Sequence, residues 1–201
     1  MGEKSLDWTS VQEYLAIDEA SSNRNEYDNG VVVAMTGGTL NHGIIGSNIN
    51  TAIHNSLSGR QMDCTAINGD VRIFIEQANS FVYPDGMVVC GTIETFESDP
   101  HSVVNPLLVV EVLSKSTESY DRGDKFHKYC SLASFQEYVL ISQYKPIVDT
   151  LYRSEKGVWQ MITTIGLEKS IYLNTIGAFI KMEDIYHKTI GLTSPTFRLD
   201  S

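Results

Sequence analysis

The sequence lacks several features that would assign a compartment at once. No apolar run approaches the roughly 18 residues that a membrane-spanning helix requires, and the N-terminal stretch MGEKSLDW has no apolar signal-peptide core. Cysteine is scarce. The chain has three, Cys64, Cys90 and Cys130, which is an odd number, and they are widely spaced. That pattern favours reduced thiols over a disulfide framework or a zinc site. We therefore expect a cytoplasmic protein that does not associate with membranes.

Motifs of several enzyme classes are also missing. The TGG segment at 36–38 lacks the lysine and hydroxyl residue that follow in a phosphate-binding Walker loop. No GxSxG segment is present to hold a nucleophilic serine. Four histidines have no metal-ligand spacing with one another or with a cysteine: His54, His101, His127 and His187.

Positive charge is in short supply. The chain has 15 Lys and Arg against 25 Asp and Glu, so its formal net charge is −10. Proteins that coat nucleic acid non-specifically need many Lys and Arg contacts to phosphates, and this composition argues against that class. It leaves room for an enzyme that contacts nucleic acid locally, with a metal ion between its carboxylates and the phosphate.

Local patterns predict a mixed α/β (α+β) fold. Ser10 and Glu13 form a capping box that predicts a first helix, and Asn29-Gly30 predicts the turn of a hairpin over 25–35. A helix is predicted by apolar residues spaced four apart: Ile45, Ile49, Ile53 and Leu57. The other predicted elements are strands at 68–76, 81–90, 106–114 and 135–142, a helix over 117–131 capped by Thr117, a hairpin over 147–165, a strand at 171–173 and a helix near 182–187. We expect one domain over 1–191 and a polar tail over 192–201.

Three acids lie in or beside the predicted strands. Asp70 begins one strand, Pro84-Asp85 interrupts the next, and Glu111 lies inside the apolar run LLVVEVLS. A buried, unpaired carboxylate costs several kcal/mol, so Glu111 requires a partner, a proton or a metal ion. Neighbouring strands lie about 4.8 Å apart, so acids at one level can converge on one ion. Hard oxygen ligands suit Mg²⁺ or Mn²⁺.

Each acid also has a simpler interpretation. Pro-Asp-Gly at Asp85 is an ordinary turn sequence, and Glu111 alone fits a structural ion pair with a lysine or arginine. Asp70 follows Asn-Gly and fits a strand-edge residue without a role. The combination of an acid beside Pro84 with an acid inside an apolar strand favours the metal site.

These segments resemble a known family. YPDGMVVC followed by NPLLVVEVLSKSTESYDRGDKFHKY is similar to the signature of the Uma-two family of restriction-endonuclease-like proteins. NEYDNGVVVAMTGGTLNH, NGDVRI and QEYVLIS extend the resemblance over roughly residues 8–187. It implies a PD-(D/E)XK nuclease core, in which a central mixed β-sheet is flanked by helices, together with an extra N-terminal hairpin. The expected activity is metal-dependent hydrolysis of DNA phosphodiester bonds.

The resemblance also assigns roles to individual acids. Asp85 and Glu111 match the two motif acids that hold Mg²⁺ or Mn²⁺. Asp70 matches an acid that completes the metal shell. Glu26 matches an acid that supports the metal ligands without binding the metal itself. Many nucleases of this fold act as dimers, so the resemblance also favours a homodimer.

One position departs from the family pattern. The motif's lysine belongs two residues after the second acid, where this chain has Leu113. That lysine orients the attacking water and neutralises charge on phosphorus. Lys125, on the predicted helix after the Glu111 strand, is the favoured replacement, and Lys115 is the alternative.

Basic residues recur on the same predicted helix. Arg122, Lys125 and Lys128 are three residues apart and share one face, which favours contact of Arg122 and Lys128 with DNA. The acids between them, Asp121 among others, favour a solvated mixed-charge helix instead. His42, at the predicted start of the preceding helix, is a further candidate for phosphate contact, although its position favours a cap or packing role.

Two other functions use the same residues. Leu113 and the net charge fit a catalytically inactive nuclease-fold protein that serves as a nucleic-acid or protein interaction module. A metal phosphohydrolase acting on small substrates would also use Asp85 and Glu111.

Overall fold

The computed structural model describes residues 8–35, 37–60 and 62–195. Residues 1–7, Thr36 of the TGG segment and tail residues 196–201 lie outside the described residues. Two six-stranded sheets and one two-stranded sheet make up the β structure. The helices are α1 (Val11–Ala20), α2 (Leu40–Ser58), α3 (Glu118–Arg122), α4 (Asp124–Cys130) and α5 (Met182–Ile185), with a 3-10 turn η1 at Glu76–Ala78.

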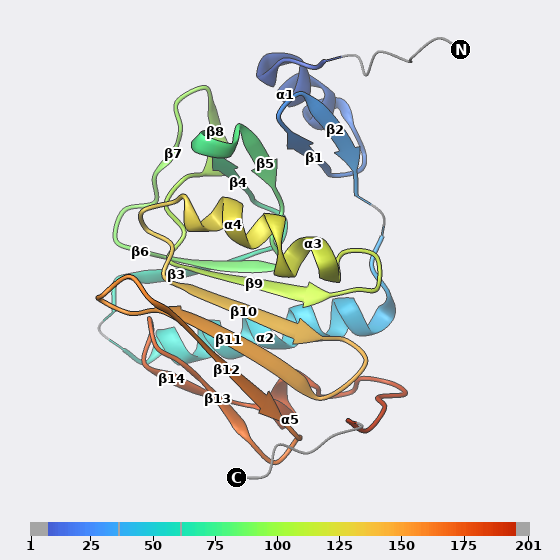
Figure 1. Cartoon of the computed structure of the whole chain (residues 1–201), viewed down its shortest axis with the longest axis vertical. Coiled ribbons are helices and arrows are strands. Elements are labelled where there is room, and N and C mark those ends of the chain that lie inside the picture. The colour runs from blue at the N-terminus through green and yellow to red at the C-terminus, as the bar shows by residue number, and fades with distance from the viewer. Residues whose placement is uncertain (1–7, 36, 61, 196–201) are drawn as a thin grey trace.

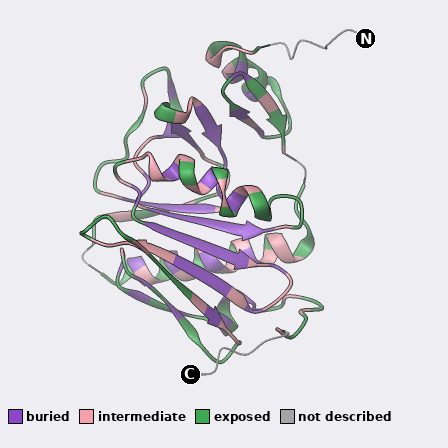
Figure 2. Ribbon diagram, viewed as in Figure 1, coloured by how far each residue is buried: buried purple, intermediate pink, exposed green. Residues whose placement is uncertain are grey.

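The central sheet has the strand order β12-β11-β10-β9-β6-β3. Its strands are β3 (Cys64–Asn68), β6 (Gly86–Cys90), β9 (Leu108–Leu113), β10 (Glu137–Ser142), β11 (Ile147–Arg153) and β12 (Trp159–Ile165). β9 and β10 are parallel while the other pairs are antiparallel, which makes the sheet mixed, as predicted. Every residue of β9 is buried, because helices cover both of its faces (Figures 1 and 2).

The two faces of β9 bury different layers. Val110 and Val112 pack against the apolar stripe of α2, which the sequence predicted and which is buried throughout. Val109 and Leu113 pack on the other face, where Tyr129 of α4 lies. Glu111 has the same parity as Val109 and Leu113, so its side chain points to the α4 side.

The N-terminal sheet has the order β2-β1-β5-β4-β8-β7. Its strands are β1 (Asn25–Asp28), β2 (Val31–Ala34), β4 (Arg72–Ile75), β5 (Ser80–Val82), β7 (Thr95–Phe96) and β8 (Asp99–Val103). The predicted capping box of α1 is present. Asn29 and Gly30 both have positive φ, at 44° and 98°, so the predicted hairpin turn is also confirmed. α1 packs on this sheet through a buried aromatic cluster. The helix contributes Tyr14, and the strands contribute Tyr27, Phe74 and Phe81.

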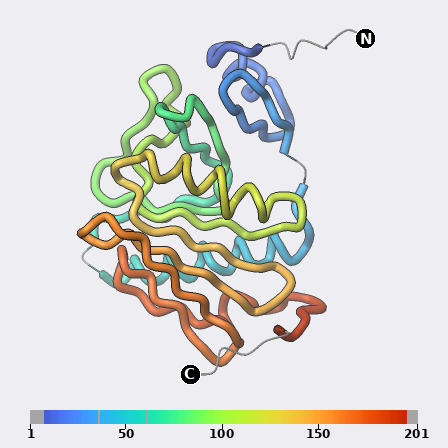
Figure 3. Tube along the Cα trace, viewed as in Figure 1, coloured from blue at the N-terminus to red at the C-terminus, as the bar shows by residue number. Residues whose placement is uncertain are grey.

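The C-terminal part of the chain packs on α2, which lies much earlier in the sequence. The hairpin of β13 (Ser170–Leu173) and β14 (Ala178–Lys181), together with α5, packs on α2. Figure 3 shows this C-terminal part beside the much earlier α2. The predicted hairpin over 147–165 is present as β11 and β12, with Gly157 at φ 76° in its turn.

Three predicted elements differ from the structure. The predicted strand 81–90 is two strands in different sheets, β5 and β6, because the chain passes between the sheets at Pro84-Asp85. The predicted helix 117–131 is two helices, because Gly123 adopts a non-helical φ of −113° and ψ of −100°, and Thr117 makes no side-chain cap. The strand predicted over 68–76 begins only at Arg72, which leaves Asp70 in the preceding turn. Within the strand the side chains alternate, since Ile73 and Ile75 enter one core cluster and Phe74 another.

The prediction that all three cysteines are reduced thiols is wrong. Cys64 and Cys90 lie directly opposite each other on β3 and β6 and form a disulfide, with Cα atoms 3.9 Å apart. Only Cys130 is a free cysteine among the described residues. Strand register brings the pair together, and spacing along the chain does not reveal it. The argument from unpaired thiols to a reducing compartment therefore no longer holds.

Within the described ranges, no helix combines the length and apolar character needed to cross a bilayer.

Candidate active site

Asp85 lies in the short link between β5 and β6, at the end of the central sheet. Its backbone N–H donates to the carbonyl of Val110 at 3.0 Å, and its Oδ2 accepts from the backbone N–H of Val112 at 2.6 Å. These bonds attach Asp85 to β9 on both sides of Glu111. The two motif acids therefore extend from adjacent, hydrogen-bonded segments.

Glu111 is buried on the α4 side of β9. Its Oε1 accepts a hydrogen bond from the Tyr129 hydroxyl at 2.9 Å and lies 2.9 Å from Lys125 Nζ. Burial raises the pKa of Glu111 well above its usual value, although the Lys125 charge opposes this rise. The partner that the sequence required for this buried carboxylate is thus Lys125.

Lys125 extends from α4 into a cage of carboxylates. Besides Glu111, its Nζ lies 3.2 Å from Glu26 Oε1 and 3.8 Å from Asp121 Oδ1, and it donates to the Tyr83 carbonyl at 3.2 Å. Burial opposes the ammonium charge, but the surrounding carboxylates outweigh it and raise the pKa of Lys125 well above its usual value. The side chain is therefore a fixed cation.

Glu26 reaches the site from β1 in the N-terminal sheet. Its Oε1 accepts the backbone N–H of Tyr83 at 3.0 Å in addition to contacting Lys125. Tyr83 therefore binds Glu26 through its N–H and Lys125 through its carbonyl. Two residues later in the chain, Asp85 enters the same site.

His42 approaches Asp85 from the first turn of α2. Its Nε2 lies 3.3 Å from Asp85 Oδ2. The hydrogen bond to Asp85 raises the pKa of His42, while partial burial opposes the rise. Thr39, the N-cap of α2, accepts the backbone N–H of His42 and fixes the start of the helix.

Four sequence candidates lie apart from this cluster. Asp70 is exposed in the turn after β3, where it accepts from Asn68 and pairs with Arg24. Arg122 pairs with Glu118 and Asp149. Lys128 pairs with Asp28 at 2.8 Å, and Lys115 lies against the Tyr144 ring. The predicted common basic face does not form, since Lys125 is buried and the chain breaks from helical geometry at Gly123.

Two residues of the cluster were missed or underrated from the sequence. The sequence pattern favours Asp121 as a solvated acid of a mixed-charge helix, yet Asp121 is buried, and burial raises its pKa. Its spacing of four from Lys125 was the available signal. Tyr83 contributes through its backbone, which leaves no signal in the side-chain pattern.

Asp85 and Glu111 are the donors of this cluster that could hold a magnesium-type ion. No group of three or more His, Cys, Asp or Glu side chains is arranged for metal binding within the part of the chain that the structure describes. Mg²⁺ is bound through one or two carboxylates and otherwise keeps its waters or takes phosphate oxygens. Asp85 and Glu111, two hard-oxygen donors on adjacent segments, meet that requirement.

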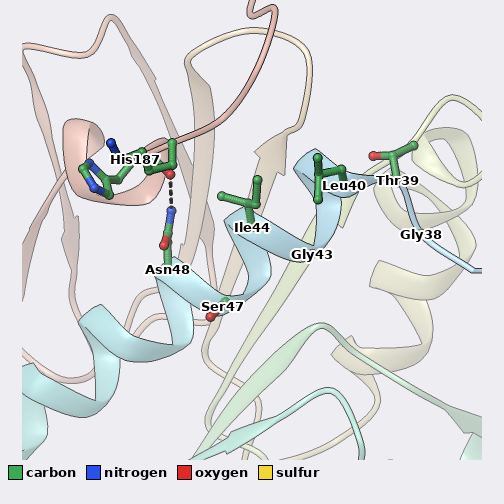
Figure 4. Close-up of a pocket in the computed structure, with 9 residues that line it drawn as sticks. Gly38, Thr39, Leu40, Gly43, Ile44, Ser47, Asn48 and His187 are labelled. Atoms are coloured by element: carbon green, nitrogen blue, oxygen red, sulfur yellow. Dashed lines mark hydrogen bonds between the residues drawn. The ribbon is translucent and has the colours of Figure 1, made fainter.

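An open pocket of about 710 Å³ lies elsewhere, along the first half of α2. Figure 4 shows its mixed polar and apolar lining, in which the Asn48 side chain donates to the carbonyl of His187. The residues that line it do not include the acids or Lys125: Gly38, Thr39, Leu40, Gly43, Ile44, Ser47, Asn48, His187 and Lys188. The chemistry of the cluster therefore does not extend into this pocket.

Comparisons with known proteins identify relatives that cover most of this chain. The chain is 34% identical over 177 residues to "Uncharacterized protein slr1290" of Synechocystis sp., covering 88% of this chain and 90% of that protein. It is 28% identical over 157 residues to "Uncharacterized protein sll1609" of the same organism, covering 78% and 88%. A crystal structure titled as "a putative nuclease belonging to DUF820" from Anabaena variabilis matches with a TM-score of 0.69. It covers 88% of this chain and 97% of its own at 16% identity, which shows a common fold.

The sequence profile of one family matches most of the chain. The Uma2 family, described as "Putative restriction endonuclease", matches residues 11–180. That range contains both motif acids, Lys125 and the N-terminal hairpin with Glu26. The chain belongs to the Uma2 family.

Proposed function

We propose that this protein is a metal-dependent endonuclease that hydrolyses DNA phosphodiester bonds. The observation that carries the proposal is the position of Lys125, whose Nζ lies 2.9 Å from Glu111 while Asp85 is bonded to the next residue of β9. Two acids with a lysine beside them are the residues that the PD-(D/E)XK motif uses. Here a helix supplies the lysine that the strand lacks at Leu113.

Each residue has a role that follows from its surroundings. Asp85 and Glu111 would hold Mg²⁺ or Mn²⁺, which when bound polarises a phosphate and lowers the pKa of a water. Because its pKa is raised, Lys125 is protonated and does not serve as a general base. It stabilises negative charge that develops on the phosphoryl oxygens. Glu26 and Asp121 hold the ammonium in place, since an unpaired buried cation would be costly.

The proposal includes DNA as the substrate and a homodimer as the assembly. DNA is supported by the family description, and the net charge of −10 restricts contact to a local patch. The homodimer remains a prediction that sedimentation would test. Asp70 as a third metal ligand and Arg122 and Lys128 as DNA contacts also remain predictions. The contacts described above give Asp85, Glu111 and Lys125 more support.

The test is nicking of supercoiled DNA with Mg²⁺ or Mn²⁺. Asp85→Asn, Glu111→Gln and Lys125→Ala should each lower the rate by at least about a hundredfold, as loss of one electrostatic stabiliser commonly does. Glu183→Gln and Lys181→Ala are matched controls, because this exposed ion pair lies on β14 and α5, and they should leave the rate unchanged. Nicking that persists in both acid variants would disprove the site.

A second candidate function is the inactive interaction module. The tight pairing of Glu111 with Lys125 favours it, because the ammonium occupies one oxygen that a metal ion would use. Calorimetric titration with Mn²⁺ separates the two functions. Binding that is lost in Asp85→Asn supports the nuclease, and absence of binding in the wild-type protein supports the module.

A further inference from the structure

The start of β1 presents alternate residues to the active site. Side chains two apart on a strand share a face, and Glu26 and Asp28 use that face to pair with Lys125 and Lys128 of α4. Arg24 directly precedes β1, two residues before Glu26, and its carbonyl accepts the backbone N–H of Met35 at 2.9 Å, which extends the pairing of β1 with β2 by one residue. It therefore lies beyond Glu26, at the end of the strand away from Asp28.

Arg24 rests on the two segments that hold Asp85. Its guanidinium lies 5.7 Å from the centre of the Tyr83 ring, and Nη1 donates to the carbonyl of Gly69. Gly69 in turn packs closely on the chain at Asp85, since a Cβ placed on it would lie 2.8 Å from the Pro84 carbonyl and 3.4 Å from the Asp85 Cα. Arg24 thus contacts the two segments next to Asp85: Tyr83, which precedes it in the chain, and Gly69, which packs on it.

Exposure distinguishes Arg24 from the other cations near the acids. The Lys125 and Lys128 side chains are 5% and 14% exposed, whereas that of Arg24 is 48% exposed. Arg122 is 37% exposed but pairs with two carboxylates. The carboxylate beside Arg24 is Asp70, at 3.7 Å and with its side chain 78% exposed. An ion pair this exposed is weak, so an incoming phosphate can compete for the guanidinium.

We propose that Arg24 binds a backbone phosphate of DNA next to the one attacked, and that Asp70 orients Arg24. The inference rests on the proposed endonuclease function and assigns its phosphate contact. A guanidinium presents a planar fork of donors that matches phosphate oxygens. The assignment also explains how a protein of net charge −10 can offer DNA an exposed cation near its acids. Asp70 is then a positioning residue.

Binding of a short fluorescein-labelled DNA duplex tests the role of Arg24. Anisotropy titrations are made at several KCl concentrations with Ca²⁺ present, under conditions where the duplex is recovered uncut. Arg24→Ala should weaken binding roughly threefold to tenfold and lower the slope of log K against log salt by about 0.9, the effect of one lost phosphate contact. Arg24→Lys should retain most of the slope. Lys156→Ala, which removes an exposed charge from the β11–β12 turn, is the matched control and should change neither quantity.

The outcomes separate this inference from the proposed function. Wild-type protein that binds and nicks DNA, with equal salt slopes for Arg24→Ala and Lys156→Ala, overturns the role of Arg24 alone. Wild-type protein that neither binds nor nicks DNA overturns both. Retained melting temperature in Arg24→Ala ensures that a changed slope reports on contact and not on unfolding.

A second variant tests the role of Asp70. If Asp70 orients Arg24, Asp70→Asn should keep Mn²⁺ affinity at the wild-type value, because no metal contact is lost. It should leave nicking within about threefold, because the exposed 3.7 Å ion pair is weak. If Asp70 is a metal ligand, the same change should reduce Mn²⁺ affinity as Asp85→Asn does. That second result would overturn the positioning role.

Discussion

A single ammonium group is the common partner of three carboxylates at the site. Three carboxylates lie within 4 Å of Lys125 Nζ: Glu26, Glu111 and Asp121. Taking charges out of water is costly, and geometry alone makes such a cluster tolerable. The same arrangement that suits catalysis is therefore a risk to stability, and the two effects can be measured separately.

Loss of the Lys125 charge should destabilise the folded protein. Lys125→Met leaves the carboxylates unpaired, and we expect a loss of about 3–5 kcal/mol in the free energy of unfolding, measured by urea denaturation without metal. Lys128→Met is the control, since it breaks an ion pair with the half-exposed Asp28 and should cost less than about 1 kcal/mol. Equal losses in the two variants would contradict this account.

The pH dependence of the Lys125→Met variant has a definite sign. Without the ammonium, the largest effect that opposes the burial-driven rise in the pKa of Glu111 is lost, and the Tyr129 hydrogen bond remains. The folded state then binds a proton that the unfolded state releases near its ordinary value of 4.5, so stability falls as pH rises above that value. Adding Glu111→Gln should remove this dependence. A steep fall that persists in the double variant would point to Asp121 or Glu26 instead.

At the scale of elements, the loop that carries Asp85 depends on a close approach of backbone. Gly69→Ala would place a Cβ 2.8 Å from the Pro84 carbonyl, and backbone cannot rotate away as a side chain can. We expect a loss of about 1–3 kcal/mol in stability, with reduced nicking because Asp85 shifts. Gly43→Ala is the control: its Cβ would meet nothing within 4 Å, and alanine inside α2 should add about 0.5–1 kcal/mol. A neutral Gly69→Ala would show that the loop has room to move.

Local patterns predicted the elements that depend on neighbouring residues. The capping box of α1, the Asn29-Gly30 turn and the stripe of α2 are set by residues within a few positions of each other. Four strands were missed: β3, β7, β8 and β14. The β8 sequence DPHSV is polar and contains a proline, and it becomes a strand by parallel pairing with β4 far along the chain. Such pairing has no local signature.

The site was predictable to a similar degree. Asp85 and Glu111 stood out because each breaks a strand pattern, and Lys125 because it follows Glu111 on a helix. Glu26 came only from resemblance to a family, since its strand lies in another sheet. Asp121 was missed because its burial depends on the break at Gly123 and on how α3 and α4 pack against β9. Residues that approach from separate elements require the fold itself to bring them together.

At the scale of the whole molecule, one covalent link encloses the Asp85 loop. The disulfide between Cys64 and Cys90 spans a sequence separation of 26 residues that includes β4, β5 and the turn carrying Asp70. Closing a loop of this length restricts the unfolded chain and is expected to stabilise the fold by about 2–4 kcal/mol. The site and its two neighbouring sheets should therefore respond together to reduction.

Reduction should lower the melting temperature of the wild-type protein. In calorimetry with and without a thiol reductant, we expect a drop in the oxidised protein and no further drop in a Cys64→Ser/Cys90→Ser variant, because that variant has no link to break. Cys130→Ser keeps the disulfide and removes the free thiol, so it should respond like the wild type. A wild-type melting temperature that reductant does not change would mean that the link adds nothing to stability. Gly86, next to Asp85, is paired with Asn68 of β3 on one side and with Val110 of β9 on the other. Nicking measured on the reduced protein would then show whether this strand pairing holds the Asp85 loop without the disulfide.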